Sequence, residues 1–354
     1  MKVLLQSICK LRRHFDRLPK TRSIDRIVQL SFLAILMLLQ IAACGELHSP
    51  KLEQSAQNCR IIEHDVGQTH LCKPLQSIAA LSPHVLDIML ALGVEPDAYA
   101  DVSVLNQRRF DQPAKQIRYL GSRMTKQPIN LGDRHSPALE TLAFLKPNLI
   151  LGEAWQGSQG QYDLLSKIAP TALFEDQPVG GWRRSIEGIA KAIDRQDRVS
   201  FILAAQEQRI INARQALSPV VAIHPRMLLL SSGSLAAGFY MFGQEPDLYS
   251  TLIEKLGFQL VRVDSFDAPI SVERLSKIDT DSIIVISWDE ADNANPSAWQ
   301  RRQQEWNQIP VLNALKVSQA GRVYFMDAHL TTLREPIAEE LILQDLLKLL
   351  APSN

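Results

Sequence analysis

The sequence predicts an α/β fold in which two lobes with mainly parallel sheets are joined by one long α-helix, with a ligand cleft between the lobes. Three observations support it. Short apolar segments alternate with helical ones over residues 77–174 and again after Pro219, the segment between them is suited to helix alone, and the two halves share a weak repeat. Alternation of strands and helices is typical of parallel sheets covered by helices on both faces.

The first lobe is expected over residues 59–180. Residues 77–81 are apolar and short, like a buried strand, and Ser82 and Pro83 then open a helical pattern that ends at Gly93. Serine before a helix and glycine after it are start and stop signals. The alternation continues through residues 142–151, 162–168 and 171–174.

The connection and the second lobe follow. Residues 180–217 contain no proline, and helix-forming residues dominate, which predicts one long helix preceded by a shorter one over a linking segment at 181–218. After Pro219 the alternation resumes with MLLLSS, a helix at 248–256, SIIVIS and VYFMDA, so a second lobe is expected over residues 219–354.

A weak internal repeat places the functional surfaces. Glu140 lies eight residues before Asn148 and 15 before Trp155, and Glu273 has the same offsets from Asp281 and Trp288. Each glutamate should lie near the start of a short helix, exposed on an outer surface. Each tryptophan should follow the carboxyl end of a buried strand, where open α/β sheets bind ligands.

The amino-terminal segment has the features of an export signal. Residues 27–43 carry no charge, follow Arg26 directly and end in small residues before Cys44. An uncleaved anchor or a buried apolar helix is the alternative, and the long basic segment ahead of residue 27 leaves the initiation codon open. Residues 1–43 are therefore expected to be a signal peptide and residues 44–58 a polar tether.

The remaining cysteines fit an oxidising compartment. Cys9 lies in the expected signal peptide and Cys44 directly follows it, so Cys59 and Cys72 are the remaining pair of cysteines. They lie on two β-prone arms around Val66 to Gln68. A hairpin could bring the thiols together in a disulfide, and two free thiols are the alternative.

Charge and motifs argue against several functions. The whole chain has 38 basic and 38 acidic residues, but eight of the basic and only two of the acidic ones precede Cys44, leaving 30 and 36. An acidic body is a poor polyanion binder, so no nucleic-acid partner is expected. The sequence lacks a G-x-S-x-G elbow and a glycine-rich phosphate loop, and its eight histidines are scattered, so neither catalysis nor a protein-held metal is expected.

Several segments, in this order, resemble one family: LSPHVLDIMLALGVEP, YLGSR, SPALETLAFLKPNLILG, YDLLSKIAP, SSGSLAAGFYMFGQEPDLYSTLIEKLGF, ISVERLSKIDTDSIIVIS and IPVLNALKVSQAGRVYFMD. Together they resemble the substrate-binding lipoproteins of bacterial ABC importers for iron–siderophores, the class with two Rossmann-like lobes and a single rigid interdomain helix. IAAC at residues 41–44 resembles the lipobox of such lipoproteins, with Cys44 lipidated and first in the mature chain.

The resemblance assigns roles to individual residues. Glu140 and Glu273 match the glutamates that dock into arginine pockets of the permease. Arg123 matches an arginine that follows a YLG strand and pairs with anionic ligand oxygens. This sequence departs by inserting MTKQPINLGDRH, so Arg134 could take that role instead. The expected cleft aromatics and a further cation are Trp155, Trp288, Tyr240 and Arg334.

The resemblance implies a monomeric, lipid-anchored protein outside the cytoplasmic membrane that captures a ferric siderophore and delivers it to an ABC permease driven by a separate ATPase. No cofactor is implied, because the siderophore holds the iron. Capture of cobalamin or haem on the same scaffold, or a lipid-anchored α/β enzyme, are the alternatives. The two arginines, Arg123 and Arg134, favour an anionic ligand over a corrin ring.

Overall fold

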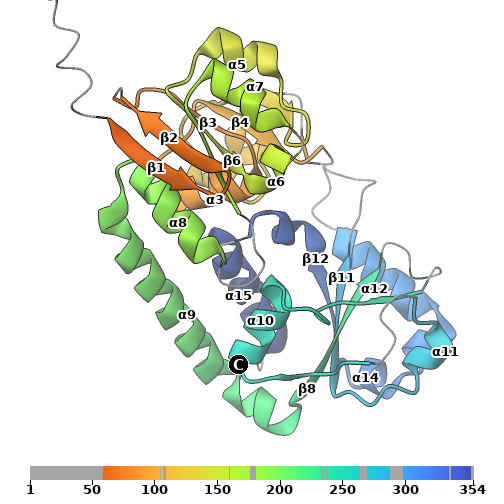
Figure 1. Cartoon of the computed structure of the whole chain (residues 1–354). Helices are drawn as coiled ribbons and strands as arrows, with labels where there is room; N and C mark the ends of the chain where they lie inside the picture. Colours follow the sequence, from red (N-terminus) through yellow and green to blue (C-terminus); the bar gives the residue numbers. More distant parts are fainter. Residues whose placement is uncertain are drawn as a thin grey trace, which may run out of the picture. The chain divides into compact units, whose positions relative to one another are not determined.

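The fold is that of a computed structural model, which describes residues 59–351 apart from 73, 104, 107–108, 159, 176–180, 233–234, 236–237, 264–268, 288–297 and 335. The described residues belong to one compact unit. This unit contains two α/β lobes, each built on a mainly parallel sheet (Figure 1). The predicted fold class is therefore confirmed.

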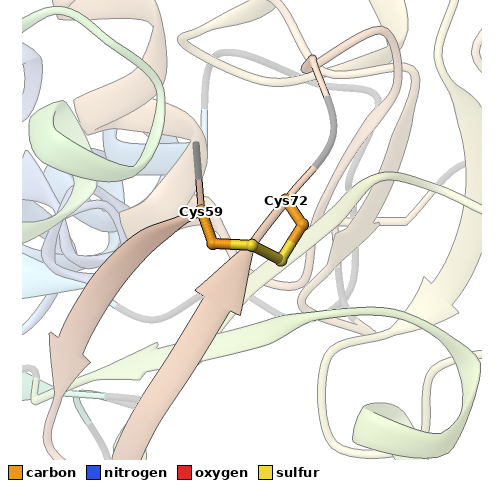
Figure 2. The surroundings of a disulfide bond; sticks show 2 residues. All are labelled: Cys59 and Cys72. Carbon is orange, nitrogen blue, oxygen red and sulfur yellow. A yellow bond between two sulfur atoms is a disulfide. The ribbon is translucent and has the colours of Figure 1, made fainter. Parts of the chain in front are cut away.

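A disulfide-closed hairpin begins the described chain. Strands β1 (Arg60–His64) and β2 (Gly67–Leu71) pair antiparallel, so that Arg60 lies opposite Leu71 and His64 opposite Gly67. Cys59 and Cys72, immediately outside the paired residues, are joined by a disulfide (Figure 2). The bond thus closes the open end of the hairpin.

The first lobe has a parallel five-stranded sheet in the order β5-β4-β3-β6-β7. The predicted strand near residue 78 and helix after Ser82 are both present, and the Ser82 hydroxyl accepts a hydrogen bond from the Val85 N–H at the start of that helix. Gly93 ends this region with a φ of 77°, a conformation that favours glycine. The strands are β3 (Ile78–Ala80), β4 (Ala98–Asp101), β5 (Ile129–Asp133), β6 (Leu149–Glu153) and β7 (Thr171–Phe174). The helices are α3 (Pro83–Ala91), α4 (Pro113–Gln116), η2 (Gly121–Arg123), α5 (Leu139–Leu145), α6 (Ala154–Ser158) and α7 (Gln161–Ile168).

The YLG segment is not a strand, which corrects the sequence-based expectation. Tyr119 has a φ of 64°, outside the extended region, and the chain then enters the short helix η2. A Cβ at Gly121 would lie 1.9 Å from the carbonyl oxygen of Pro113, so only glycine fits this turn. The close backbone approach folds the segment back instead of extending it.

The helical connection consists of α8 (Gly181–Ala192) and α9 (Gln196–Ile223), the shorter and longer helices that the sequence predicts. Helix α9 continues through Pro219 to Ile223, beyond residue 218, where the sequence predicts that the linking segment ends. Proline cannot donate to the carbonyl four residues earlier, that of Gln215. The Ser218 hydroxyl donates to that carbonyl oxygen at 2.9 Å, which satisfies the acceptor and lets the helix continue.

The second lobe repeats the arrangement of the first. Its parallel strands have the order β10-β8-β11-β12, and β9 pairs antiparallel with β8. The strands are β8 (Arg226–Ser232), β9 (Tyr240–Met241), β10 (Gln259–Leu260), β11 (Ser282–Ser287) and β12 (Val323–Asp327). The helices are α10 (Leu248–Lys255), α11 (Val272–Leu275), α12 (Ala298–Gln308), α13 (Pro310–Asn313), α14 (Lys316–Gln319), η4 (Ala328–Thr332) and α15 (Ile337–Leu350).

The sequence repeat has a structural counterpart. A short helix carrying Glu140 (α5) precedes β6, and a short helix carrying Glu273 (α11) precedes β11. Strand β6 lies between β3 and β7, and β11 between β8 and β12. The two lobes therefore share one local topology around these glutamates.

Both sheets are apolar on both faces, as parallel sheets covered by helices should be. In β6, Leu149 and Leu151 belong to one buried cluster while Ile150 belongs to another. In β11, Ile284 and Ile286 alternate in the same way with Ile283 and Val285. The largest cluster also includes residues of α3, α8, α9 and α15, so one continuous core joins the lobes to the connecting helices. Within the described residues, no helix is both long and apolar enough to cross a membrane.

Candidate functional site

The predicted residues Arg134 and Trp155 meet beside the carboxyl ends of two strands of the first lobe. Arg134 directly follows β5, and Trp155 lies in α6, directly after β6. The guanidinium carbon of Arg134 lies 5.7 Å from the centroid of the Trp155 ring, a cation–π contact. One guanidinium nitrogen also lies 3.4 Å from a carboxylate oxygen of Glu153.

Neighbouring side chains hold this pair in place. The His135 ring lies 4.8 Å from the Trp155 ring, and its Nδ1 is 3.1 Å from an Asp133 carboxylate oxygen. Gln156 is buried and donates from Nε2 to the Arg134 carbonyl oxygen at 2.9 Å. Its Oε1 accepts from the Glu153 N–H at 2.9 Å, so one amide side chain ties the end of β5 to the end of β6.

Two buried acids surround the cation. Glu153 is fully buried and Asp101, at the end of β4, is 2% exposed. Burial raises the pKa of Asp101 to about 6, although the Tyr99 hydroxyl, the Val102 N–H and the Arg134 charge act in the opposite direction. The Arg134 side chain keeps 17% of its surface exposed, so its positive charge remains accessible at the strand ends.

A second cluster joins the two lobes at the end of β12. Asp327 accepts from Arg118 and from the Tyr119 hydroxyl of the first lobe, and from the His329 N–H at 2.9 Å. Burial opposes charge on Asp327, but hydrogen bonds from His329 and Tyr119 and the Arg118 charge hold its pKa below the ordinary value. The Tyr249 hydroxyl donates to the Asp327 carbonyl oxygen at 2.7 Å.

The other predicted ligand residues that the structure describes belong to other elements of the fold. Arg123 pairs with Glu340 of α15 at 2.7 Å. Tyr240, on β9, is 52% exposed, and Arg334 follows η4 with a φ of 80°. Trp288, the expected second cleft indole, lies outside the described residues, as does the proposed lipidation site Cys44.

Both predicted docking glutamates are exposed. Glu140 is in the first turn of α5, and Glu273 in the first turn of α11. Hydrogen bonds from its own N–H and from the Ser271 hydroxyl hold the pKa of Glu273 below the ordinary value, so its carboxylate is charged at neutral pH. Acids in a first turn also suit the helix dipole.

Two hollows lie away from Arg134 and Trp155. One, of about 320 Å³, lies beside α11 and is lined by residues 275–280, 283 and 314–317. The other, of about 350 Å³, lies between the hairpin and α8, where His64, Phe174 and Lys191 line it. In the part of the chain that the structure describes, no group of three or more His, Cys, Asp or Glu side chains is placed to hold a metal ion.

Sequence reasoning missed His135, Arg118, Tyr119 and Asp327 as functional candidates. Their signal is positional: His135 and Asp327 lie at strand ends, and Tyr119 belongs to the YLG segment. The arrangement around Arg134 offers a planar cation, an indole and an imidazole at one edge of a sheet. Such a surface is suited to an anionic ligand with flat or conjugated groups.

Comparison with known sequences identifies the family. The sequence model described as periplasmic binding protein matches residues 78–330, which is more than half of the chain. The chain belongs to the periplasmic binding protein family. The match begins at β3 and ends in η4, and so spans both sheets and the helical connection.

Curated members of the family are similar over nearly their whole length. The putative ABC transporter substrate-binding lipoprotein YhfQ of Bacillus subtilis is 25% identical over 320 residues, covering 86% of this chain and 91% of the relative. The Fe(3+)-citrate-binding protein YfmC of the same organism is 26% identical over 309 residues, covering 86% and 90%.

Solved structures share the fold. Staphylococcus aureus SirA, complexed with staphyloferrin B, aligns with a TM-score of 0.61 and 18% identity, covering 82% of this chain and 97% of that one. The periplasmic catecholate-siderophore binding protein VctP of Vibrio cholerae aligns with a TM-score of 0.60 and 20% identity, covering 82% and 99%.

Proposed function

We propose that this periplasmic binding protein captures a ferric siderophore outside the cytoplasmic membrane and delivers it to an ABC permease powered by a separate ATPase. The observation that carries the proposal is near full-length similarity to curated relatives of one type. One is named as an Fe(3+)-citrate-binding protein and another as a probable siderophore-binding lipoprotein. No catalysis is part of this function, since the siderophore supplies the iron ligands and the protein recognises the whole complex.

The ligand binds in a cleft between the lobes, with Arg134 and Trp155 on the first-lobe wall. Arg134 supplies a planar cation that donates to two oxygens at once, and Trp155 offers an aromatic face. Both arginines have an acidic partner, but Arg123 is the weaker candidate because its pair with Glu340 is closer, 2.7 Å against 3.4 Å for Arg134 and Glu153, and because Arg134 contacts the Trp155 ring. Trp288, Tyr240 and Arg334 are the second-lobe candidates.

Delivery uses the two exposed glutamates. Glu140 and Glu273 lie at equivalent places in the two lobes, each in the first turn of a helix that leads into a central strand. Each is proposed to pair with an arginine pocket on one half of the permease. Charged rim contacts of this kind set orientation and association rate more than affinity.

The remaining proposals concern the chain ends and the organisation. Residues 1–43 are the signal peptide, Cys44 carries the lipid, and residues 44–58 tether a monomer to the membrane. The lobes comprise residues 59–180 and 219–354, and residues 181–218 link them. The disulfide between Cys59 and Cys72 suits the oxidising compartment that this location implies.

Fluorescence titration of the chain from residue 45 onward tests the ligand class. Ferric citrate or a ferric hydroxamate should quench tryptophan emission saturably, and the iron-free chelators should do so less. Saturation by cobalamin or haem, with no response to the ferric chelates, would replace the proposal with the alternative ligand on the same scaffold.

A further inference from the structure

The ring of Phe144 is the most exposed large apolar side chain among the described residues, at 88%, and the next, Phe201 on α9, is 72% exposed. Phe144 is the sixth residue of α5, the seven-residue helix that carries Glu140. Aromatic side chains are enriched at protein–protein interfaces relative to the rest of the surface. A single exposed apolar residue is ordinary, but this one shares a short helix with a predicted docking glutamate.

Helix geometry puts the two side chains together. Glu140 and Phe144 are separated by one turn, so they share a helix face, and the exposed Ala143 lies on the same face without covering the ring. The opposite face holds the helix on the lobe. Leu142 is fully buried, and Leu139 and Leu145 pack partly buried against the same cluster. Folding of α5 therefore does not require a ring at position 144.

The second lobe lacks this feature. Aligning Glu140 with Glu273 also aligns the buried Leu142 with the buried Leu275, so the register of the repeat holds in the structure. The residue that corresponds to Phe144 is then Lys277, which is exposed. In the first lobe one short helix thus presents both an acid and an aromatic ring, whereas in the second lobe the corresponding cation, Lys277, lies just beyond the end of α11.

The length of the chain ahead of the described residues limits which partners the first-lobe helix can reach. The proposed lipid site, Cys44, begins a stretch of 15 residues, 44–58, that leads to Cys59. Fully extended, they span at most about 50 Å. The tethered lobes therefore remain near the outer surface of the membrane, where an embedded permease presents its extracytoplasmic face.

We propose that Phe144 is an apolar anchor of the first-lobe docking surface, which inserts into a recess of the permease next to the cation that pairs with Glu140. The proposal rests on the proposed function and extends it. The partner surface is defined by its chemistry: an apolar depression bordered by basic residues. Because Lys277 occupies the equivalent place in the second lobe, the anchor also makes docking directional, since only one lobe fits that recess.

Site-specific photocrosslinking tests the anchor. Full-length chains carrying a benzoyl-phenylalanine at position 143, 144, 201 or 277, each of which keeps both docking glutamates, are produced in the cells that make this protein and irradiated intact. We expect positions 143 and 144 to crosslink to the membrane-embedded permease subunit and position 201 not to do so. Crosslinking at 143 but not at 144 would overturn the anchor and leave the proposed function standing, whereas no permease crosslink from 143, 144 or 277 would overturn both.

A matched pair of variants measures the contribution of the ring. The permease identified by crosslinking is purified without the probe and reconstituted in lipid nanodiscs. Phe144→Ser should weaken binding to it by about 10-fold or more, as loss of an aromatic interface anchor does. Phe201→Ser, at the other highly exposed phenylalanine, should bind like the parent. Both variants should keep the parent circular dichroism spectrum, and equal affinities for all three proteins would refute the anchor.

Discussion

The carboxylate of Asp87, in α3 of the first lobe, caps the amino terminus of the final helix, α15, by accepting the Ile337 N–H at 2.8 Å. Its other oxygen accepts the Ala338 N–H at 2.9 Å. The two ends of this contact are 250 residues apart in sequence, and both are buried. The first N–H groups of a helix have no partner within it, and here a side chain of a distant helix supplies one.

Removing this cap should destabilise the fold. Asp87→Ala leaves two buried N–H groups without an acceptor, and we expect the free energy of unfolding to fall by about 2 to 4 kcal/mol. Asp87→Asn keeps one oxygen acceptor and should lose less. Urea unfolding followed by circular dichroism measures both, with Asp163→Ala on the exposed side of α7 as the control. A midpoint for Asp87→Ala equal to that of the control would show that the cap contributes nothing.

The stability of the protein should decrease as the pH rises, in part because of Glu339. Burial raises the pKa of Glu339 to about 7, against hydrogen bonding from Gln206 and the charges of Lys255 and Arg209. Because the folded-state pKa is above the unfolded value, the folded state binds more protons between them. The contribution of protonated Glu339 to the free energy of unfolding is thus complete below about pH 4.5 and is lost as the pH rises to about 7.

Glu339→Gln should remove this pH dependence while keeping an acceptor for Gln206. Relative to the variant, the parent should lose about 1 to 3 kcal/mol of unfolding free energy between about pH 4.5 and about pH 7.5. Urea titrations at the two pH values give the difference. If parent and variant change in parallel, Glu339 does not titrate in this window.

Arg134 should contribute to ligand affinity, and Arg123 should not. Arg134→Ala removes the guanidinium above the Trp155 ring and should weaken an anionic ferric chelate by about 1.5 to 3 kcal/mol, as for charge-assisted bonds. Arg123→Ala breaks a pair with Glu340 instead and should leave affinity within about twofold of the parent. Tryptophan fluorescence titrations of the three proteins with ferric citrate decide between them. The reverse order of effects would move the ligand site toward η2.

The disulfide that closes the hairpin should stabilise the folded protein. It closes a loop with a sequence separation of 13, for which chain entropy predicts a contribution of about 3 kcal/mol. The double variant Cys59→Ser and Cys72→Ser should unfold at correspondingly lower urea concentration. The reductant dithiothreitol should lower the midpoint of the parent but not that of the variant, and a parent insensitive to reduction would argue against this contribution.

Much of the fold could be predicted because its signals are local. Residues 78–80 and 282–287 are short and apolar, Ser82 precedes a helix, and residues 180–217 lack proline. These local patterns predicted the strands, the helix cap and the helical connection. Strand β5 was missed because it lies inside an apparent insertion of polar residues. The course of α9 through Pro219 depends on a hydroxyl that replaces a missing donor, which no propensity signals.

The candidate site could be predicted only in part. The sequence offsets placed Trp155 after a central strand, and the inserted segment offered Arg134 as an alternative to Arg123. Neither observation showed which arginine contacts the indole. That choice depends on β5, which ends immediately before Arg134, and on α15, which supplies Glu340 to Arg123. The Asp327 cluster could not be predicted, because its partners Arg118 and Tyr119 are more than 200 residues away in sequence.

Native mass spectrometry identifies the bound ligand from the mass of the complex. The purified chain from residue 45 onward is mixed with ferric citrate, a ferric hydroxamate and a ferric catecholate, and separately with cobalamin and haem. We expect a one-to-one complex whose added mass equals that of one of the ferric chelates, iron included. Bare protein in every ferric mixture, together with a saturable complex of cobalamin or haem, would contradict the proposed function.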